Sequence, residues 1–556
     1  MKQGKKGLPD YLGAVALAGA LILLVIVNIG WGSHWIDSDM AAEMIFSKLL
    51  AEEGKLIATT NWFYSTEFRV LYTQLVMVPL HHIFTDWQTI RIITNCVFYG
   101  LMLAGFVFVC KPLRLKRRNV CFLALALFVP VSEAVMTHLQ MGNTYMSHVI
   151  LSFVILGLFL RLSNPGKLRK VSGIVYSLLF ALLCMILGIS GVRYLLDLLV
   201  PMMLTAAWFV LQGDAFQRFR KQMSRENFSG LFKDNKTAYL YVSFGAVLMG
   251  AVGYLINALI ISRRFRFQTY DATNFIAVHE GVFFDRVQNA LGELLQMFGY
   301  IENRGFLSLR GLITMLAFVM IATFGYVWWK CLKYMRTFSK NTDRAEADRE
   351  AAEKSSEEIN RRFMVYFAGI SLALHLFVFI FTTSTMVDRY FIPIAIFFLL
   401  VVGIYMEWEA VAFDKIAVCL ILLGCLSLAG LKTYASFVTN DKNQDRYEMA
   451  DYLVEEGYTF GYASYWNSNI MTELSDGALE MANLWSLESL GDFQWSSKMS
   501  SYEPKEGKVF LIADKGELDA LKEHGMLKQE IIFENDSFTV LHFDSQQEFL
   551  QYRTAE

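Results

Sequence analysis

Three carboxylates stand directly after the first long apolar run of the chain. Asp37, Asp39 and Glu43 follow the run that ends near Trp31. If a helix begins at Ser38 or Asp39, then Asp39 and Glu43 lie one turn apart on the same face, with Asp37 in the entry turn. Because a carboxylate can take the proton of an attacking hydroxyl, Asp37 or Asp39 is a candidate general base. Capping of the helix is the simpler explanation for either residue taken alone.

Arginines at the ends of apolar runs form a second candidate set. Arg193 and Arg389 stand at such ends, and Arg263 and Arg264 belong to a basic cluster at 263–266. A charge at the edge of a bilayer costs less than the roughly 2.5–3.5 kcal/mol of the bilayer centre, but it still favours an anionic partner. A guanidinium can bind a lipid phosphate through two hydrogen bonds. The alternative for each arginine is contact with ordinary lipid head groups.

The composition places the chain among membrane proteins. Of its 556 residues, 55% are hydrophobic and 18% are charged, which is too apolar for an ordinary soluble protein. The formal charge of −2 gives no support for nucleic-acid binding. The 7 cysteines lie in or beside apolar runs without metal-ligand spacing, so we interpret them as small packed side chains.

Cofactors are not defined by the sequence. No glycine-rich phosphate loop is present, which argues against an ATP-driven pump. Two close carboxylates after the first apolar run could hold a divalent cation, but the ligand set is incomplete, so the need for a metal stays open.

About eleven apolar runs are long enough to cross a bilayer, because about 20 helical residues span roughly 30 Å of hydrocarbon. The runs cover residues 11–31, 88–110, 119–136, 146–162, 171–190, 194–212, 239–262, 307–330, 363–383, 390–406 and 413–434. Lys and Arg gather in alternate loops at 111–118, 161–170, 218–236 and 330–336, as expected for loops on the inner side. The odd number of spans then places the C-terminus outside. The cluster at 263–266 departs from this pattern.

Two outer regions are long enough to fold. In the first outer loop, about 32–87, residues 38–53 have the spacing of an amphipathic helix at the membrane surface, and a second interfacial or re-entrant helix is expected over 71–84. Between them, Tyr64, Glu67 and Arg69 combine aromatic and charged groups near the candidate acids.

Residues 437–556 lose the high hydropathy of the preceding part. They predict a small α/β domain, with helices at 446–456 and 518–525, strands at 458–466 and 508–513, and a hairpin at 530–543. The predicted architecture is a polytopic helical membrane domain, residues 1–436, followed by an extracytoplasmic α/β domain, residues 437–556.

The order of these features resembles the GT-C superfamily of membrane glycosyltransferases, which includes protein O-mannosyltransferases and aminoarabinose transferases. Asp37 and Asp39 occupy the place of the acidic motif after the first span, and residues 64–91 resemble the segment that leads into the second span. The sequence 389–393 resembles the Arg-Tyr and Pro pattern at a late span. The pattern often has Asp-Glu where this chain has Asp-Ser-Asp, which leaves open which Asp is the base.

The resemblance implies transfer of a hexose or pentose from a polyprenyl-phosphate donor to a glycan, lipid or protein acceptor at the outer face of the plasma membrane. Asp37 or Asp39 would be the base, and Arg193, Arg389, Arg263 and Arg264 would bind the donor phosphate. Glu43, Tyr64, Glu67 and Arg69 would lie near the substrates. A lipid or solute transporter, or a non-catalytic assembly protein that acts through its outer domain, remains an alternative.

Overall fold

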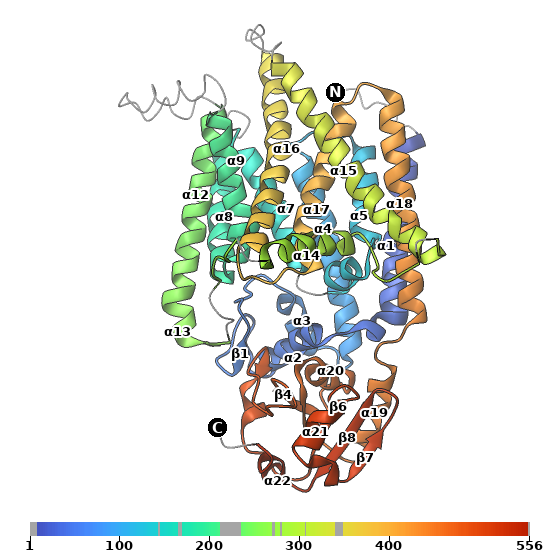
Figure 1. Cartoon of the computed structure of the whole chain (residues 1–556). Helices are drawn as coiled ribbons and strands as arrows, with labels where there is room; N and C mark the ends of the chain where they lie inside the picture. Colours follow the sequence, from blue (N-terminus) through green and yellow to red (C-terminus); the bar gives the residue numbers. More distant parts are fainter. Residues whose placement is uncertain are drawn as a thin grey trace.

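The structure is a computed structural model in which a bundle of long helices stands on a smaller α/β domain (Figure 1). It describes residues 8–142, 145–164, 170–211, 235–268, 273–278, 281–305, 307–339 and 349–553. The α/β domain is formed by the C-terminal part of the chain and lies at one end of the bundle. The polytopic helical fold with a C-terminal α/β domain, which the sequence predicted, is therefore confirmed.

Nine helices in the described part of the chain are long and apolar enough to cross a membrane. They belong to the elements α1 (Leu8–Trp31), α4 (Trp87–Cys110), α7 (Tyr145–Leu162), α8 (Lys170–Ser190), α12 (Asn235–Ile256), α15 (Leu309–Ser339), α16 (Arg349–Phe381), α17 (Ile392–Trp408) and α18 (Ala412–Thr439). Each of these helices overlaps one of the apolar runs of the sequence.

The two remaining apolar runs are helical but do not form simple spans. In the run 119–136, α5 (Arg117–Phe128) is followed by the helical segment Glu133–Gln140, and the two are bent by 96°. Pro130 has no backbone N–H and disfavours helix in the residue before it, and that residue is extended in the structure. The other run contains a shorter apolar helix, Leu195–Leu211. In the part of the chain that the structure describes, the expected number of about eleven spans thus becomes nine, or ten with the bent pair.

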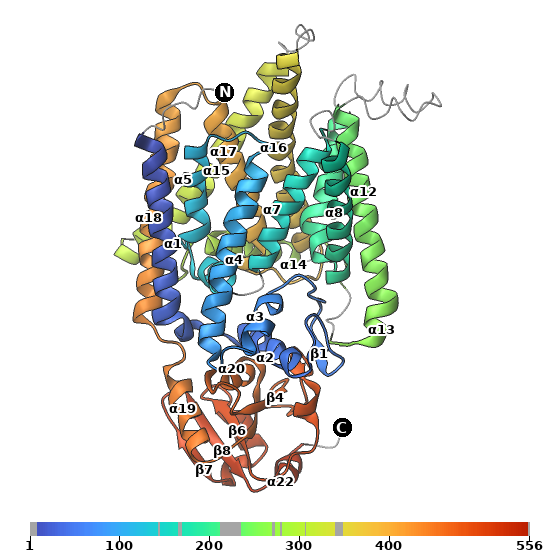
Figure 2. The same cartoon turned by 180° about the vertical axis from the view of Figure 1, so that it is seen from behind.

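The basic loop at 111–118 lies at the end of the bundle far from the α/β domain (Figure 2). It packs against α16, because Arg361 Nε donates a hydrogen bond of 3.0 Å to the carbonyl of Leu113. Nearly all of the predicted basic loop at 218–236, and half of that at 161–170, lie outside the described residues.

The loop between α1 and α4 lies between the bundle and the α/β domain (Figure 2). Its elements are η1 (Gly32–Trp35), α2 (Ser38–Glu52), β1 (Trp62–Tyr64) and α3 (Gln74–His81). Asp37 caps α2, since its carboxylate accepts a hydrogen bond of 2.8 Å from the amide of Met40. The expected helix at 38–53 is present, but protein covers most of its surface, because α3 and the α/β domain pack against it.

The C-terminal domain is built on a five-stranded sheet in the order β4-β3-β6-β8-β7. Its strands are β3 (Phe460–Ser464), β4 (Glu480–Leu484), β6 (Val509–Asp514), β7 (Ile531–Glu534) and β8 (Phe538–Phe543), and its main helices are α19 (Gln444–Glu455), α20 (Tyr465–Leu474) and α21 (Leu518–Glu523). Strand β3 is parallel to β4 and β6, whereas β8 is antiparallel to β6 and β7. The predicted helices, strands and hairpin are confirmed, but α20 and β4 were not predicted.

Two sets of contacts join the C-terminal domain to the first loop and the bundle. Strand β1 pairs in parallel with β2 (Arg266–Phe267) and antiparallel with β5 (Ser497–Lys498), so three distant segments share one small sheet. Arg91 of α4 also forms a two-pronged ion pair with Glu473 of α20, with Nε 2.8 Å from Oε1 and Nη2 2.6 Å from Oε2. The position of α20 over α2 and α4 is thereby defined.

Candidate active site

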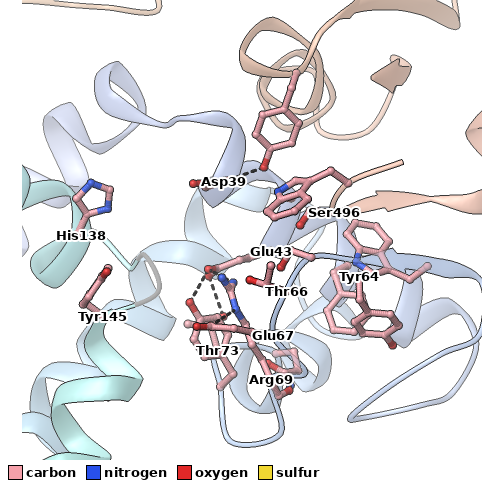
Figure 3. Close-up of a pocket in the computed structure, with 18 of the residues that line it drawn as sticks. Asp39, Glu43, Tyr64, Thr66, Glu67, Arg69, Thr73, His138, Tyr145 and Ser496 are labelled. Carbon is pink, nitrogen blue, oxygen red and sulfur yellow. Dashed lines mark hydrogen bonds and ion pairs between the residues drawn. The ribbon is translucent and has the colours of Figure 1, made fainter. Parts of the chain in front are cut away.

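A cavity of about 380 Å³ lies where the helix bundle, the first loop and the C-terminal domain meet. We call it the chamber. Figure 3 shows Asp39, Glu43 and Arg69 on one side of it and His138 and Tyr145 across from them. Its polar lining residues include Asp39, Glu43, Thr66, Glu67, Arg69, Thr73, His138, Tyr145, Arg193, Arg389, Tyr390, Ser464, Tyr465 and Ser496.

The two aspartates of the acidic stretch have different surroundings. Asp39 lies in the first turn of α2 and lines the chamber, where its Oδ1 accepts a hydrogen bond of 2.5 Å from the hydroxyl of Tyr465. Asp37 does not line the chamber and caps α2 instead. Burial, followed by the charge of Asp39, raises the pKa of Asp37 to about 7. The structure thus places one carboxylate toward the cavity and the other against the helix end.

Glu43 lies one turn after Asp39, as its spacing predicted, but its carboxylate is already held by three donors. Arg69 Nη1 lies 2.9 Å from Oε1, the Tyr72 hydroxyl donates to Oε1 at 2.6 Å, and the Thr73 hydroxyl donates to Oε2 at 3.1 Å. Burial raises the pKa of Glu43, while Arg69 opposes that shift. This side chain joins α2 to the loop before α3, and it has little hydrogen-bonding capacity left for a substrate.

Glu67 connects the first loop to the helix bundle. Its Oε1 lies 3.0 Å from Arg193 Nε, and its Oε2 lies 3.6 Å from Arg69 Nε. Burial alone would raise the pKa of Glu67, but Arg193 and Arg69 more than offset this effect and hold it below its usual value. Glu67 therefore remains ionised and compensates the charge of Arg193, which in turn lies over the rings of Tyr145 and Tyr390.

Arg389 lines the same chamber and lies in the 3-10 helix η7 (Asp388–Phe391), directly before α17. Asp388 is its neighbour in the chain, but no carboxylate of the described residues lies within ion-pair distance of its guanidinium. Arg263 and Arg264 are exposed on α13 (Ser262–Arg264) and do not line the chamber. Of the four arginines proposed from the sequence, the structure thus brings Arg193 and Arg389 into one cavity and leaves the other two outside.

Tyr64 lines the chamber, but its hydroxyl is occupied elsewhere. It donates to the carbonyl of Thr59 at 2.9 Å and accepts from the amide of the same residue at 3.0 Å. Its ring packs among Phe68, Phe265 and Phe267. Tyr64 therefore shapes the wall of the chamber.

Sequence reasoning missed the part of the chamber that the C-terminal domain supplies. Tyr465, Trp466, Trp485, Phe493 and Trp495 all line the chamber, together with Ser496. Burial, and then Asp39, raise the pKa of Tyr465 well above its usual value, so its hydroxyl stays protonated. The signal in the sequence was the presence of three of the 11 tryptophans of the chain within residues 465–495.

Among the described residues, no three His, Cys, Asp or Glu side chains are grouped so that they could hold a metal ion. The charged groups of the chamber are instead arranged as pairs of carboxylate and guanidinium, with Asp39 and Arg389 outside these pairs. A carboxylate able to accept a proton and a guanidinium able to bind a phosphate thus share one cavity.

The fold and the chamber define a polytopic membrane protein with a polar site between its helix bundle and an α/β domain. No family model and no curated protein matches the chain. Its fold is similar to that of ArnT from Cupriavidus metallidurans bound to undecaprenyl phosphate, with a TM-score of 0.51, 10% identity, and coverage of 96% of this chain and 98% of that one. The apo state of the same protein gives a TM-score of 0.50 at 10% identity, with coverage of 95% and 97%. The chain therefore shares the fold of ArnT over nearly its whole length.

Proposed function

We propose that the chain is a membrane glycosyltransferase that moves a sugar from a polyprenyl-phosphate donor to an acceptor hydroxyl. The observation that carries the proposal is the chamber, which holds the carboxylate of Asp39 and the guanidinium of Arg389 in one cavity. The fold supports it as well, because ArnT, which shares this fold, was crystallised with undecaprenyl phosphate.

The reaction needs one proton acceptor and one site for the departing phosphate. The acceptor oxygen attacks C1 of the donor sugar and forms the new C1–O bond, while the bond from C1 to the phosphate oxygen breaks. The electron pair of that bond leaves with the polyprenyl phosphate. Asp39 takes the proton of the acceptor hydroxyl through Oδ2, because Oδ1 already accepts a hydrogen bond from Tyr465. Phosphate leaves as an anion, so no general acid is required.

Arg389 binds the phosphate of the donor and stabilises the charge that it gains as the sugar departs. Arg193 adds positive potential from the same side of the chamber, although Glu67 compensates much of it. In this proposal Asp37 acts as the cap of α2, and Arg263 and Arg264 contact the lipid surface or solvent instead of the donor. Of the two aspartates expected from the sequence as candidate bases, the proposal keeps Asp39.

A polyprenyl-phosphate donor places the reaction at the outer face of the plasma membrane, where nucleotide sugars are not available. Residues 1–436 then form the membrane domain, and residues 437–556 form an extracytoplasmic domain that closes the chamber. The basic loop at 111–118, at the opposite end of the bundle, is consistent with this orientation.

The test compares Asp39→Asn with Asp37→Asn. Release of sugar is measured from purified polyprenyl-phosphate donors that carry a hexose or a pentose, with thermal unfolding followed in parallel. Asp39→Asn should lose a factor of roughly 10²–10⁴ in rate, because an amide cannot take the proton. Asp37→Asn should keep most activity, because Asn is also a good N-cap. Full activity of the Asp39→Asn protein, or no release by the unaltered protein from any donor, would contradict the proposal.

A further inference from the structure

The C-terminal domain gives the chamber a wall of aromatic rings. Trp466 and Trp485 are 57% and 61% exposed, and both line the cavity. Phe493 lies between Trp485 and Trp495: its ring is stacked on that of Trp495, with centroids 5.7 Å apart, and is nearly perpendicular to that of Trp485, with centroids 4.8 Å apart. Tyr465 meets the edge of Phe493 at 5.5 Å. We call these five residues the aromatic wall.

The aromatic wall carries no charge. Within the described residues, every side chain that the C-terminal domain contributes to the chamber is either aromatic or a serine. The two serines are Ser464 and Ser496. Exposure of a large indole ring to water is unfavourable, so two such rings on one cavity indicate a binding surface. Their π faces carry negative partial charge, so they pack well against the positively polarised C–H groups of a sugar ring. Serine hydroxyls can pair with the hydroxyls of such a ring.

The geometry points to the aromatic wall as the binding site for the acceptor, and to a neutral oligosaccharide as that acceptor. This inference rests on the proposed function. The hydrogen bond from Tyr465 to Asp39 joins the aromatic wall to the proposed base. The arginines of the chamber belong to the first loop and the bundle, on other walls, and would attract the anionic donor. A sugar that stacks on the indoles would therefore present a hydroxyl to Asp39.

Two other acceptor classes fit the aromatic wall less well. An anionic lipid head group would meet no cation there. A peptide bound in extended form needs free backbone groups at a strand edge. The backbone beside the aromatic wall is already paired, since the amides of Trp485 and Phe493 donate to Gly491 and Asn483, and the carbonyl of Trp495 accepts from the Asn483 side chain. A neutral sugar requires neither a cation nor a strand edge.

The test is a calorimetric titration of the full chain in detergent without donor. The three probes are the neutral oligosaccharide fraction of the source organism's cell envelope, tryptic peptides of its envelope proteins, and glycerophosphoglycerol as an anionic head group. The oligosaccharide fraction should bind. The double change Trp466→Ala and Trp485→Ala should weaken this binding roughly tenfold or more, as expected for the loss of two stacked rings. Replacement of both residues by Phe should retain part of the affinity.

Controls separate this inference from the proposed function. Trp329 is 53% exposed but does not line the chamber, so Trp329→Ala should bind oligosaccharide as the unaltered protein does. Because Trp466 and Trp485 are largely exposed, their loss should leave thermal unfolding unchanged. Binding of peptide or head group alone, binding of no probe, or oligosaccharide binding that survives the double Ala change would overturn the inference. Release of sugar from the donor by the Asp39→Asn protein tests the proposed reaction and does not test the acceptor site.

Discussion

The three arginines that line the chamber differ in what already compensates their charge. Arg193 Nε lies 3.0 Å from Glu67 Oε1, and Arg69 Nη1 lies 2.9 Å from Glu43 Oε1. Arg389 has no such carboxylate among the described residues. A guanidinium that is already paired must give up part of that pairing to hold a phosphate, whereas Arg389 can bind an anion at once. Replacement by Ala should therefore lower the stability of the protein at Arg193 and weaken donor binding at Arg389.

We expect Arg389→Ala to raise the KM for the polyprenyl-phosphate donor by about 10- to 100-fold, the range for a hydrogen bond to a charged group. Its unfolding temperature should change little. Arg193→Ala should lower the unfolding temperature, because Glu67 is left without its nearest cation, at a cost somewhat below the roughly 3–5 kcal/mol of a fully buried pair. Donor titrations and thermal unfolding in detergent measure both effects.

Arg263→Ala is the matched control for these variants, because Arg263 is exposed and lies outside the chamber. It should alter neither the KM nor the unfolding temperature. An Arg389→Ala protein with the KM of the control would remove Arg389 from the donor site.

The acids and arginines of the chamber could be proposed from the sequence because each stands next to an apolar run. Which of these residues face the cavity could not be predicted from the sequence. Whether Asp37 or Asp39 faces the cavity depends on the residue at which α2 begins, and a shift of one residue turns a helix by about 100°. Tyr465, which contacts Asp39, lies 426 residues away along the chain. No local pattern can predict such a pairing, because it is produced by the packing of α20 on α2.

Helices α4 and α20 are joined by the ion pair of Arg91 and Glu473, whose side chains are 4% and 2% exposed. Arg91 Nη2 also donates a hydrogen bond of 3.0 Å to the carbonyl of Met40 in α2. Burial raises the pKa of Glu473, and Arg91 opposes this shift. One guanidinium therefore fixes three helices around the chamber, and the loss of its partner would leave a buried charge.

We expect Glu473→Gln to destabilise the protein by about 3–5 kcal/mol, because the charge of Arg91 would remain buried without a carboxylate. The control is Asp492→Asn, which breaks the ion pair of Asp492 with Arg553, whose side chains are 33% and 23% exposed. That change should cost about 0–1 kcal/mol. Thermal unfolding in detergent measures both. Equal effects of the two substitutions would show that the pair between α4 and α20 contributes no more than a surface pair.

Helices and strands with a regular apolar pattern were predicted correctly, including the long spans and strands β3, β6 and β8. The bend after α5 was missed because average hydropathy over about 20 residues does not respond to a single Pro130. Helix α20 and strand β4 were missed because residues 465–484 mix aromatic, amide and acidic side chains without a clear period. Their buried polar groups, such as Glu473, find partners in other parts of the chain.

The orientation of the two ends of the molecule across the membrane is a prediction of its own. Lys522 lies in the C-terminal domain, and Lys116 lies in the loop at the opposite end of the bundle. Both side chains are 60% exposed, which makes them a matched pair. With a membrane-impermeant maleimide on intact cells, Lys522→Cys should be labelled, and Lys116→Cys should be labelled only after permeabilisation. The Lys and Arg content of the inner loops is the physical reason.

The protein without these substitutions gives the background for its native cysteines, of which Cys96 is exposed at the surface of α4. Labelling of Lys522→Cys only in permeabilised cells would reverse the orientation. It would also exclude the assigned reaction, because the chamber would then face the cytoplasm.

The chamber is completed by residues from both ends of the chain, and this has a consequence for biogenesis. During synthesis the N-terminal segments emerge first, at about 5–20 residues per second. Asp39 and Arg91 are thus inserted long before their partners Tyr465 and Glu473 have been made. A nascent chain that already contains every membrane span still lacks the wall that contacts Asp39. The chamber is therefore complete only when the last α/β segment docks, so under the proposed function we expect an unfinished chain to be inactive.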